Sequence, residues 1–266
     1  MIDPNEIYTP VLKINSWVFA GLVQEIKKSP TIDMMGNLLT FYWGNDEVIK
    51  AKSRDKEYVV AENTGMVFVW FHETEVEPTW QLPDFSENGA YQSYKRRYYK
   101  GKFLPHEVFD NAFDYSHLQI IHHFQKPKLR TKTIFNEYDC HVAVDIAGFE
   151  NQPFPFELNL SVHGMCAIVI RSKVKMLGME FNTKTLVLPV MIEGETHMNV
   201  VSMDPQVARP LPRLVAYLFS FYELYSLKED EIIWKHKTIW KDPDLLSSEG
   251  DLKRGMEWTR KFYAAA

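Results

Sequence analysis

The sequence predicts an α+β protein built on an antiparallel sheet with a long helix late in the chain. From about residue 130 to residue 203, β-favouring runs alternate with turn residues at short intervals, which is typical of an antiparallel meander. From Pro210 to about Trp240 the apolar residues change to helical spacing. A strand-rich region followed by one long helix favours a sheet with its helices on one face.

Before the meander, the chain is predicted to form short strands. Residues 38–43 and 57–60 are rich in aromatic and β-branched side chains. The second run leads through Asn63-Thr64-Gly65 into the apolar residues 66–72. Two β-favouring runs around a turn that contains glycine predict a β-hairpin.

A linker and a helix are expected between this hairpin and the meander. Pro78 and Pro83 mark the linker, and a further strand is predicted over residues 90–101. Pro105 then begins a helix that is predicted to run through Asp110 to about His123, because proline is favoured in the first turn of a helix.

The composition excludes several classes of function. A formal charge of −5, with only one short basic run at residues 95–97, argues against a nucleic-acid partner, which needs clustered cations. The two cysteines, Cys140 and Cys166, have no zinc-type or redox spacing. We find no signal peptide and no apolar run of about 20 residues that could span a bilayer. We therefore expect a cytoplasmic protein.

The segment from Asp110 to Phe124 contains the strongest chemical pattern. Asp114 and His117 are three residues apart, so they are expected on one helix face. His117 and His122 are five residues apart, about 140° around a regular helix. They can meet at one ion only if the helix ends or distorts between them. Two histidines alone are weak evidence, because histidines in aromatic helices are often ordinary hydrogen-bonded core residues.

Asp230 strengthens the case for a metal site. The helical row Leu227, Asp230, Ile233 places this acid on an apolar stripe, while Glu229 and Glu231 fall to either side and are expected to be solvated. A buried carboxylate is unfavourable unless it is paired or coordinated. It is either hydrogen-bonded to a nearby lysine or amide, or it completes a two-histidine, one-carboxylate triad that leaves iron(II) positions open for dioxygen.

These residues resemble a known family. The pattern Asp-x-x-His-x-x-x-x-His, with Asn111 just upstream, resembles the iron motif in the catalytic domain of Rieske non-haem iron oxygenases. The C-terminal part is similar to the ending of 3-ketosteroid 9α-hydroxylases and cholesterol 7-desaturases, through residues 229–237 and 243–246, Trp258 and Phe262-Tyr263.

The resemblance implies a helix-grip (START-like) sheet and a non-haem iron(II) oxygenase that hydroxylates or desaturates a hydrophobic, steroid-like or polycyclic substrate. It implies three iron ligands: His117, His122 and Asp230. Asp114 would orient His117 and lie on the route of electrons from a neighbouring Rieske centre, and Asn111 would line the pocket. His123 is a rival to His122, but the spacing favours His122.

The sequence departs from this family in one respect. The family carries a Rieske domain whose Cys-x-His and Cys-x-x-His pairs bind a [2Fe–2S] cluster, and these 266 residues contain no such pair. Residues 35–39 and 58–70 resemble the strands that flank the cluster-binding insert, yet only the 14 residues 44–57 separate Trp43 from Tyr58. We therefore predict a truncated Rieske-like β domain over residues 1–85, without a cluster, and a mononuclear iron domain over residues 86–266.

A missing cluster leaves the source of electrons open. A separate Rieske [2Fe–2S] protein with a reductase is the preferred source, within a ring-shaped hetero-oligomer of trimer or hexamer type. Alternatively, the substrate supplies the electrons, or the site does no redox chemistry. Two other interpretations remain: a non-catalytic structural or binding subunit of a Rieske oxygenase complex, and a hydrolase or isomerase that uses the metal as a Lewis acid.

Overall fold

The computed structural model describes residues 14–54, 56–74, 76–149, 155–176, 179–205, 210–236 and 250–263. Its largest element is an antiparallel sheet in which each strand pairs with the next. The strands are, in spatial order, β12 (Asp139–Ile146), β14 (Phe156–His163), β15 (Ala167–Met176), β16 (Met179–Ile192), β17 (Glu195–Pro205) and β8 (Tyr91–Gly101). The predicted meander and the predicted strand near residues 90–101 are confirmed.

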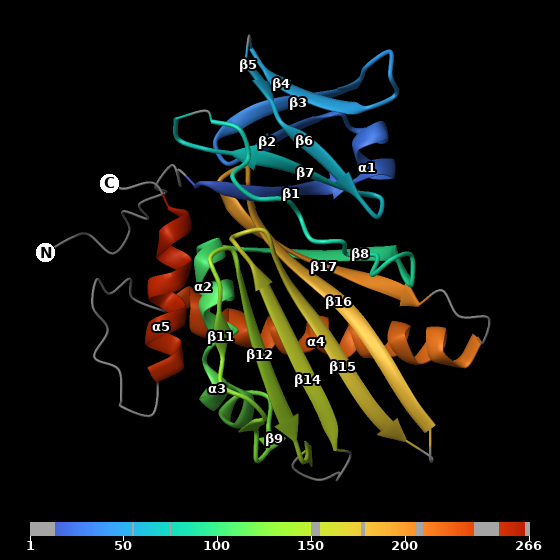
Figure 1. Ribbon diagram of the computed structural model, residues 1–266, viewed down its shortest axis with the longest axis vertical. Helices are drawn as coiled ribbons and strands as arrows, with labels where there is room; N and C mark the ends of the chain where they lie inside the picture. Colours follow the sequence, from blue (N-terminus) through green and yellow to red (C-terminus); the bar gives the residue numbers. More distant parts are fainter. Residues whose placement is uncertain are drawn as a thin grey trace, which may run out of the picture.

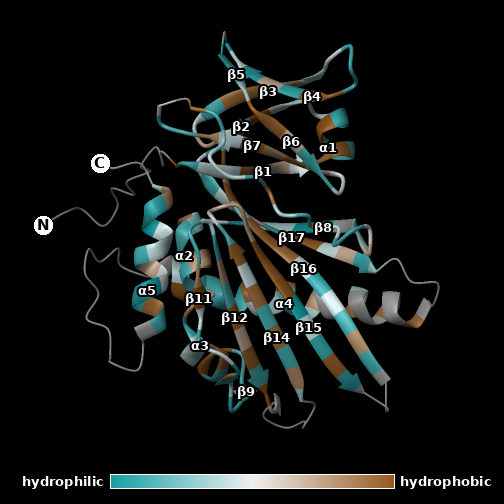
Figure 2. Ribbon diagram, viewed as in Figure 1, coloured by the Kyte–Doolittle hydropathy of each residue, from teal (hydrophilic) through white to brown (hydrophobic). Residues whose placement is uncertain are grey.

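A 27-residue helix, α4 (Pro210–His236), lies across one face of this sheet (Figure 1). The side chains of β16 alternate between two buried faces, because successive residues of a strand point in opposite directions. Val187 contributes to the core on the α4 side, whereas Leu186 and Leu188 contribute to a core on the opposite side. The predicted α+β fold with a late helix on an antiparallel sheet is confirmed, and Figure 2 shows apolar residues alternating with polar ones along these strands.

A smaller β layer precedes the main sheet in sequence and lies at one end of it (Figure 1). It consists of a three-stranded sheet, β1 (Ser16–Leu22), β7 (Met66–Phe71) and β6 (Val60–Asn63), and of a meander, β2 (Thr31–Met34), β3 (Asn37–Trp43), β4 (Ile49–Ser53) and β5 (Lys56–Tyr58), with the short helix α1 (Val23–Lys28). The pairing of Met34 with Ile192 joins the meander to β16. The predicted hairpin is confirmed as β6–β7, with Thr64 and Gly65 at positive φ in its turn.

The helix predicted from Pro105 to His123 is in fact two helices, α2 (Pro105–Asn111) and α3 (Tyr115–Ile120). Asp114 explains the break, since its carboxylate accepts hydrogen bonds from the backbone N–H groups of Ser116 and His117. A side chain that caps the free N–H groups in this way begins a new helix. Four short strands complete this region: β9 (Phe124–Gln125), β10 (Lys128–Leu129), β11 (Ile134–Phe135) and β13 (Gly148–Phe149).

The chain ends against α2. The last described elements are helix α5 (Gly250–Thr259) and the 3₁₀ turn η2 (Arg260–Phe262). Residues 237–249, which precede them, lie outside the described residues. The predicted helix end near Trp240 and residues 243–246 fall in this segment. Thr259 Oγ1 donates to Asp110 Oδ1 at 3.0 Å, which ties α5 to α2. Among the helices described, none is long and apolar enough to cross a membrane.

We expect Gly255→Ala to destabilise the protein, although alanine favours helices more than glycine does. A methyl group at Gly255 would overlap the Cβ and Cγ atoms of Phe113, a buried residue in the segment that joins α2 to α3. Overpacking of this kind costs about 1–3 kcal/mol. Urea unfolding would measure the loss, with Lys253→Ala at an exposed position of α5 as the control. Equal stability of the two variants would contradict the close packing of α5 on Phe113.

Candidate metal centre

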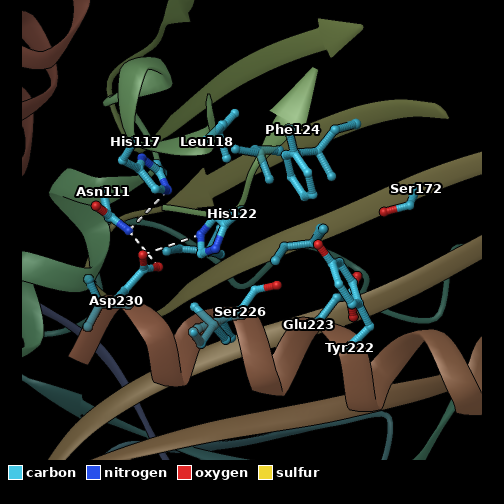
Figure 3. Close-up of a pocket in the computed structure, with 18 of the residues that line it drawn as sticks. Asn111, His117, Leu118, His122, Phe124, Ser172, Tyr222, Glu223, Ser226 and Asp230 are labelled. Atoms are coloured by element: carbon cyan, nitrogen blue, oxygen red, sulfur yellow. Dashed lines mark hydrogen bonds and ion pairs between the residues drawn. The ribbon is translucent and has the colours of Figure 1, made fainter. Parts of the chain in front are cut away.

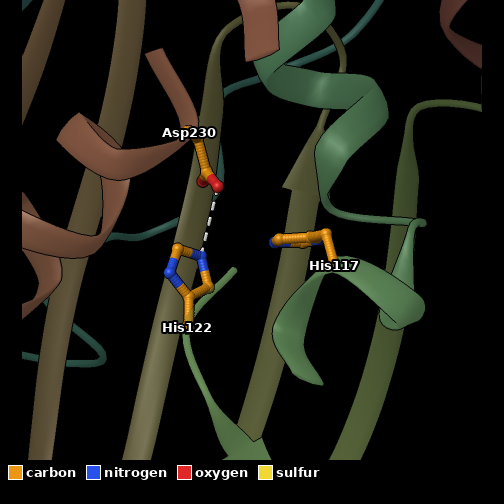
Figure 4. A group of neighbouring side chains, drawn as sticks. All are labelled: His117, His122 and Asp230. Carbon is orange, nitrogen blue, oxygen red and sulfur yellow. Dashed lines mark ion pairs between the residues drawn. The ribbon is translucent and has the colours of Figure 1, made fainter. Parts of the chain in front are cut away.

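Three buried side chains converge beside α4: His117, His122 and Asp230 (Figure 4). One ligand atom from each lies within 4.8 Å of the others. His117 lies in α3, whereas His122 follows the end of α3 and belongs to an irregular segment. The spacing of the two histidines required the helix to end or distort between them. It ends at Ile120, so His122 is not held about 140° away from His117 around a helix axis.

Asp230 is 2% exposed and receives one well-directed hydrogen bond, from Asn111 Nδ2 to its Oδ2 at 2.9 Å. Its Oδ1 lies 3.3 Å from His122 Nε2, but has no hydrogen bond of good geometry within the described parts of the chain. A buried carboxylate oxygen without a donor is unfavourable. This oxygen, together with two imidazole nitrogens, fits a divalent metal, and the donor set is the one that leaves positions open on iron(II).

His117 is oriented by the backbone. Its Nδ1 donates a hydrogen bond to the carbonyl oxygen of Asp114, which leaves Nε2 as the nitrogen with a free electron pair beside Asp230. Burial lowers the pKa of His117, although the Asp230 carboxylate partly opposes this effect. Neutral imidazole is the form that ligates metals, so this environment prepares His117 for such a role.

His122 is oriented by a carboxylate that the sequence did not indicate. Its Nδ1 lies 3.2 Å from Glu229 Oε2. Burial alone would lower the pKa of His122, but contacts with Asp230 and Glu229 outweigh it and raise the pKa. The prediction that Glu231 is solvated is wrong, because Glu231 is buried; Glu229 is partly exposed as predicted but also contacts His122. Only the path of the chain after α3 brings Glu229 and His122 together.

The other three predicted residues lie around this group in different ways. Asn111 bridges it, since its Nδ2 lies 3.3 Å from His117 Nε2 and donates to Asp230. The Asp114 carboxylate caps α3, and the Asp114 carbonyl contacts the His117 ring. Because Asp114 precedes the helix, Asp114 and His117 do not share a helix face as the sequence predicted. His123 is exposed, has a positive φ and lies outside the group.

The three residues lie at one end of a cavity between α4 and the central sheet (Figure 3). The cavity contains about 710 Å³ of space between its walls, part of it open to solvent. Most of the lining is apolar and comes from α2, α3, β9, β14, β15, β16 and α4, including Leu118, Phe124, Phe156, Leu158, Leu160, Ile168, Ile170, Val187 and Leu227. An apolar pocket with a few convergent polar groups is typical of a small-molecule site.

Glu223 also lines this cavity and was missed in the sequence. It is 7% exposed, and neither carboxyl oxygen has a hydrogen-bond partner of good geometry among the described residues. Burial raises the pKa of Glu223 to about 8, and the nearby Thr185 hydroxyl partly offsets the rise. The positions 223, 226/227 and 230 fall on one helix face, so helical spacing from Asp230 could have identified Glu223.

Comparison with known proteins identifies the family. Residues 69–263 match the model of the 3-ketosteroid 9α-hydroxylase C-terminal domain. The chain belongs to this family. The predicted resemblance to the catalytic domain of Rieske oxygenases is therefore confirmed.

Relatives of this family member include cholesterol 7-desaturases. One from Ciona intestinalis is 22% identical over 235 residues, which cover 79% of this chain and 51% of the relative. One from Hemicentrotus pulcherrimus is 22% identical over 277 residues, with 94% and 55% covered. The chain thus spans about half the length of these curated relatives.

Solved structures show the same fold at low identity. Dicamba monooxygenase bound to dicamba matches with a TM-score of 0.70 and 14% identity, over 93% of this chain and 96% of the other. A quaternary ammonium Rieske monooxygenase matches with a TM-score of 0.57 and 13% identity, over 84% and 78%. Both structural matches concern the arrangement of strands and helices. The family model, which matches residues 69–263, includes His117, His122 and Asp230.

We expect Glu223→Gln to become more stable than the wild type as pH rises. Because the folded protein holds the Glu223 proton up to about pH 8 while an unfolded chain releases it near 4.5, wild-type stability falls between these values. Glutamine does not titrate, so the variant escapes this loss, which amounts to up to a few kcal/mol.

Urea unfolding at about pH 5 and about pH 8 tests this prediction. The same substitution at the exposed Glu257 is the control. A difference between Glu223→Gln and wild type that stays constant across this pH window would contradict the buried state of Glu223.

Proposed function

We propose that this chain is a non-haem iron(II)-dependent oxygenase that hydroxylates or desaturates a hydrophobic, steroid-like or polycyclic substrate. The observation that carries the proposal is a buried group of two histidines and one aspartate at the end of an apolar cavity. Membership of the 3-ketosteroid 9α-hydroxylase family and the cholesterol 7-desaturase relatives support the substrate class.

His117, His122 and Asp230 would hold the iron. Iron(II) in such a triad supplies open positions at which dioxygen is activated. The protein's own groups orient the ligands: the Asp114 carbonyl bonds His117, Glu229 contacts His122, and Asn111 bonds Asp230. Partners of this kind strengthen metal binding by holding each ligand in the required orientation. The apolar walls exclude water and position the substrate beside the triad.

We further propose that electrons come from a separate Rieske [2Fe–2S] protein and a reductase. The two cysteines, Cys140 and Cys166, are buried in the catalytic region and have no Cys-x-His neighbour. After β3, the chain passes through residues 44–48 directly into β4 and β5. We therefore propose that residues 1–85 are a Rieske-like β domain without a cluster and residues 86–266 the iron domain. A similar solved structure, the quaternary ammonium Rieske monooxygenase, is described with inter-subunit electron transfer.

Iron binding should depend on the triad. His117→Ala and Asp230→Ala should each lose most bound iron, because two remaining ligands hold a divalent ion far more weakly than three. His123→Ala should keep it, since His123 is exposed outside the group. Metal analysis after anaerobic reconstitution with iron(II) measures the bound iron. Iron should also raise the melting temperature of the wild type but not that of the two triad variants. A full equivalent of iron in both triad variants would refute the site.

Turnover should require a partner and should depend on Asp114. Oxygen uptake coupled to product formation is expected only with a Rieske protein and a reductase present. Asp114→Asn should keep iron and fold, because asparagine also caps helices and the backbone carbonyl that bonds His117 remains. It should slow turnover strongly if the carboxylate lies on the electron route.

The other interpretations give different results in the same experiment. A structural subunit would support its partner's activity when the triad is substituted, and a Lewis-acid hydrolase or isomerase would act without oxygen. Full single-turnover activity of the isolated, chemically reduced chain, unchanged in Asp114→Asn, would leave the partner without a role.

A further inference from the structure

A second polar side chain, Glu223, lines the end of the cavity opposite the triad. In Figure 3, His117, His122 and Asp230 lie at one end, whereas Glu223 and Ser172 lie toward the other, with Ser226 between them on α4. Glu223 precedes Asp230 by seven residues, and a helix rises 1.5 Å per residue, so the two are about 10 Å apart along α4. A molecule in the cavity can therefore contact both ends at once.

Among the described residues, the Thr185 hydroxyl lies near Glu223 but only partly offsets the effect of its burial. Both of its carboxyl oxygens are buried without a hydrogen bond of good geometry among the described residues. No lysine or arginine is among the residues that line the cavity, so Glu223 does not neutralise a cation there. Since a buried polar group without a partner is destabilising, an apolar residue here would make a more stable protein.

Besides that of Thr185, which lies near Glu223, two further hydroxyl groups lie on the sheet that faces this part of α4. Ser172 in β15 and Thr183 in β16 are direct cross-strand neighbours, and both are 2% exposed. Neither hydroxyl has a hydrogen-bond partner among the described residues, and Ser172 lines the cavity. Apart from Ser226, whose hydroxyl is also without a partner among the described residues, the walls between these groups and the triad are apolar. Most of the unpartnered polar atoms thus lie toward the two ends of an otherwise apolar cavity.

We propose that Glu223 is a specificity-determining residue that binds a hydroxyl or keto oxygen at one end of a rigid apolar substrate, while the other part of the substrate faces the triad. This proposal rests on the proposed function, because the triad defines which end reacts. At neutral pH the Glu223 carboxyl is protonated, given its pKa of about 8, so it can donate to a carbonyl or exchange hydrogen bonds with a hydroxyl. The substrate oxygen and the carbon presented to the triad are then less than about 10 Å apart.

A matched pair of probes tests this role. Androstane, a saturated four-ring hydrocarbon, and its 3-hydroxy derivative differ by one oxygen and can be delivered from cyclodextrin to the full chain under anaerobic conditions. Equilibrium dialysis gives both dissociation constants. The wild type should prefer the hydroxylated probe by about tenfold after correction for partition into cyclodextrin, the effect of one buried hydrogen bond that leaves no protein group unpaired.

Substitutions then assign the preference to Glu223. Glu223→Leu should bind both probes equally, while Glu223→Gln, which keeps a donor and an acceptor, should retain most of the preference. Glu223→Met, unbranched like glutamate, serves the same purpose if the leucine variant does not fold. Lys228→Leu, at an exposed position of the same helix outside the cavity lining, is the control and should leave the ratio of the two constants unchanged.

The proposal is overturned if the wild type fails to bind the hydroxylated probe, if it shows no preference, or if a folded Glu223→Leu or Glu223→Met variant keeps the wild-type ratio. Iron content measured on the same samples separates this failure from failure of the proposed function. A ratio that depends on Glu223 in protein that cannot bind iron supports the binding role and refutes the oxygenase. Stoichiometric iron with an unaltered ratio refutes the binding role alone.

Discussion

The end of α3 at Ile120, between His117 and His122, determines the geometry of the site. The Asp114 side chain caps α3, and its carbonyl accepts the Nδ1 hydrogen of His117. Because α3 then ends at Ile120, His122 leaves the helical path and faces His117 from an irregular segment. A continuous helix would keep the two imidazoles about 140° apart. Asp114 therefore orients His117, and the end of α3 at Ile120 allows His122 to converge with it.

Helix α4 supplies both polar ends of the cavity. Asp230 meets Asn111 and His122 near one end of the cavity, and Glu223, two turns earlier, lies at the other. The sheet opposite supplies apolar side chains from alternate positions of β14, β15 and β16, since only every second residue of a strand faces the helix. The length of the cavity thus follows from helix rise, and its apolar walls follow from strand alternation.

Two carboxyl groups on this helix have different environments. Asp230 has a donor on one oxygen and an imidazole near the other, which fits its proposed role as a metal ligand. Glu223 has neither a well-directed donor nor an imidazole beside it among the described residues, and burial raises its pKa to about 8 although the Thr185 hydroxyl opposes the rise. Such groups reduce the stability of the empty protein, and they are retained where binding a metal or a substrate supplies the missing partner. The cavity therefore combines a charged end with an end that is neutral at physiological pH.

The sequence by itself determined the fold class, because strand alternation in residues 130–203 and helical spacing after Pro210 are local properties of the chain. The spacing of His117 and His122 showed that they could meet only if a helix ended between them, and Asp230 lay on an apolar stripe; the resemblance to Rieske oxygenases then implied that the three residues meet. Only the tertiary structure decided that Glu229 reaches His122 and that Asp114 acts through its backbone carbonyl. These contacts join residues 107 positions apart or depend on a backbone turn, and no periodicity along the chain encodes either.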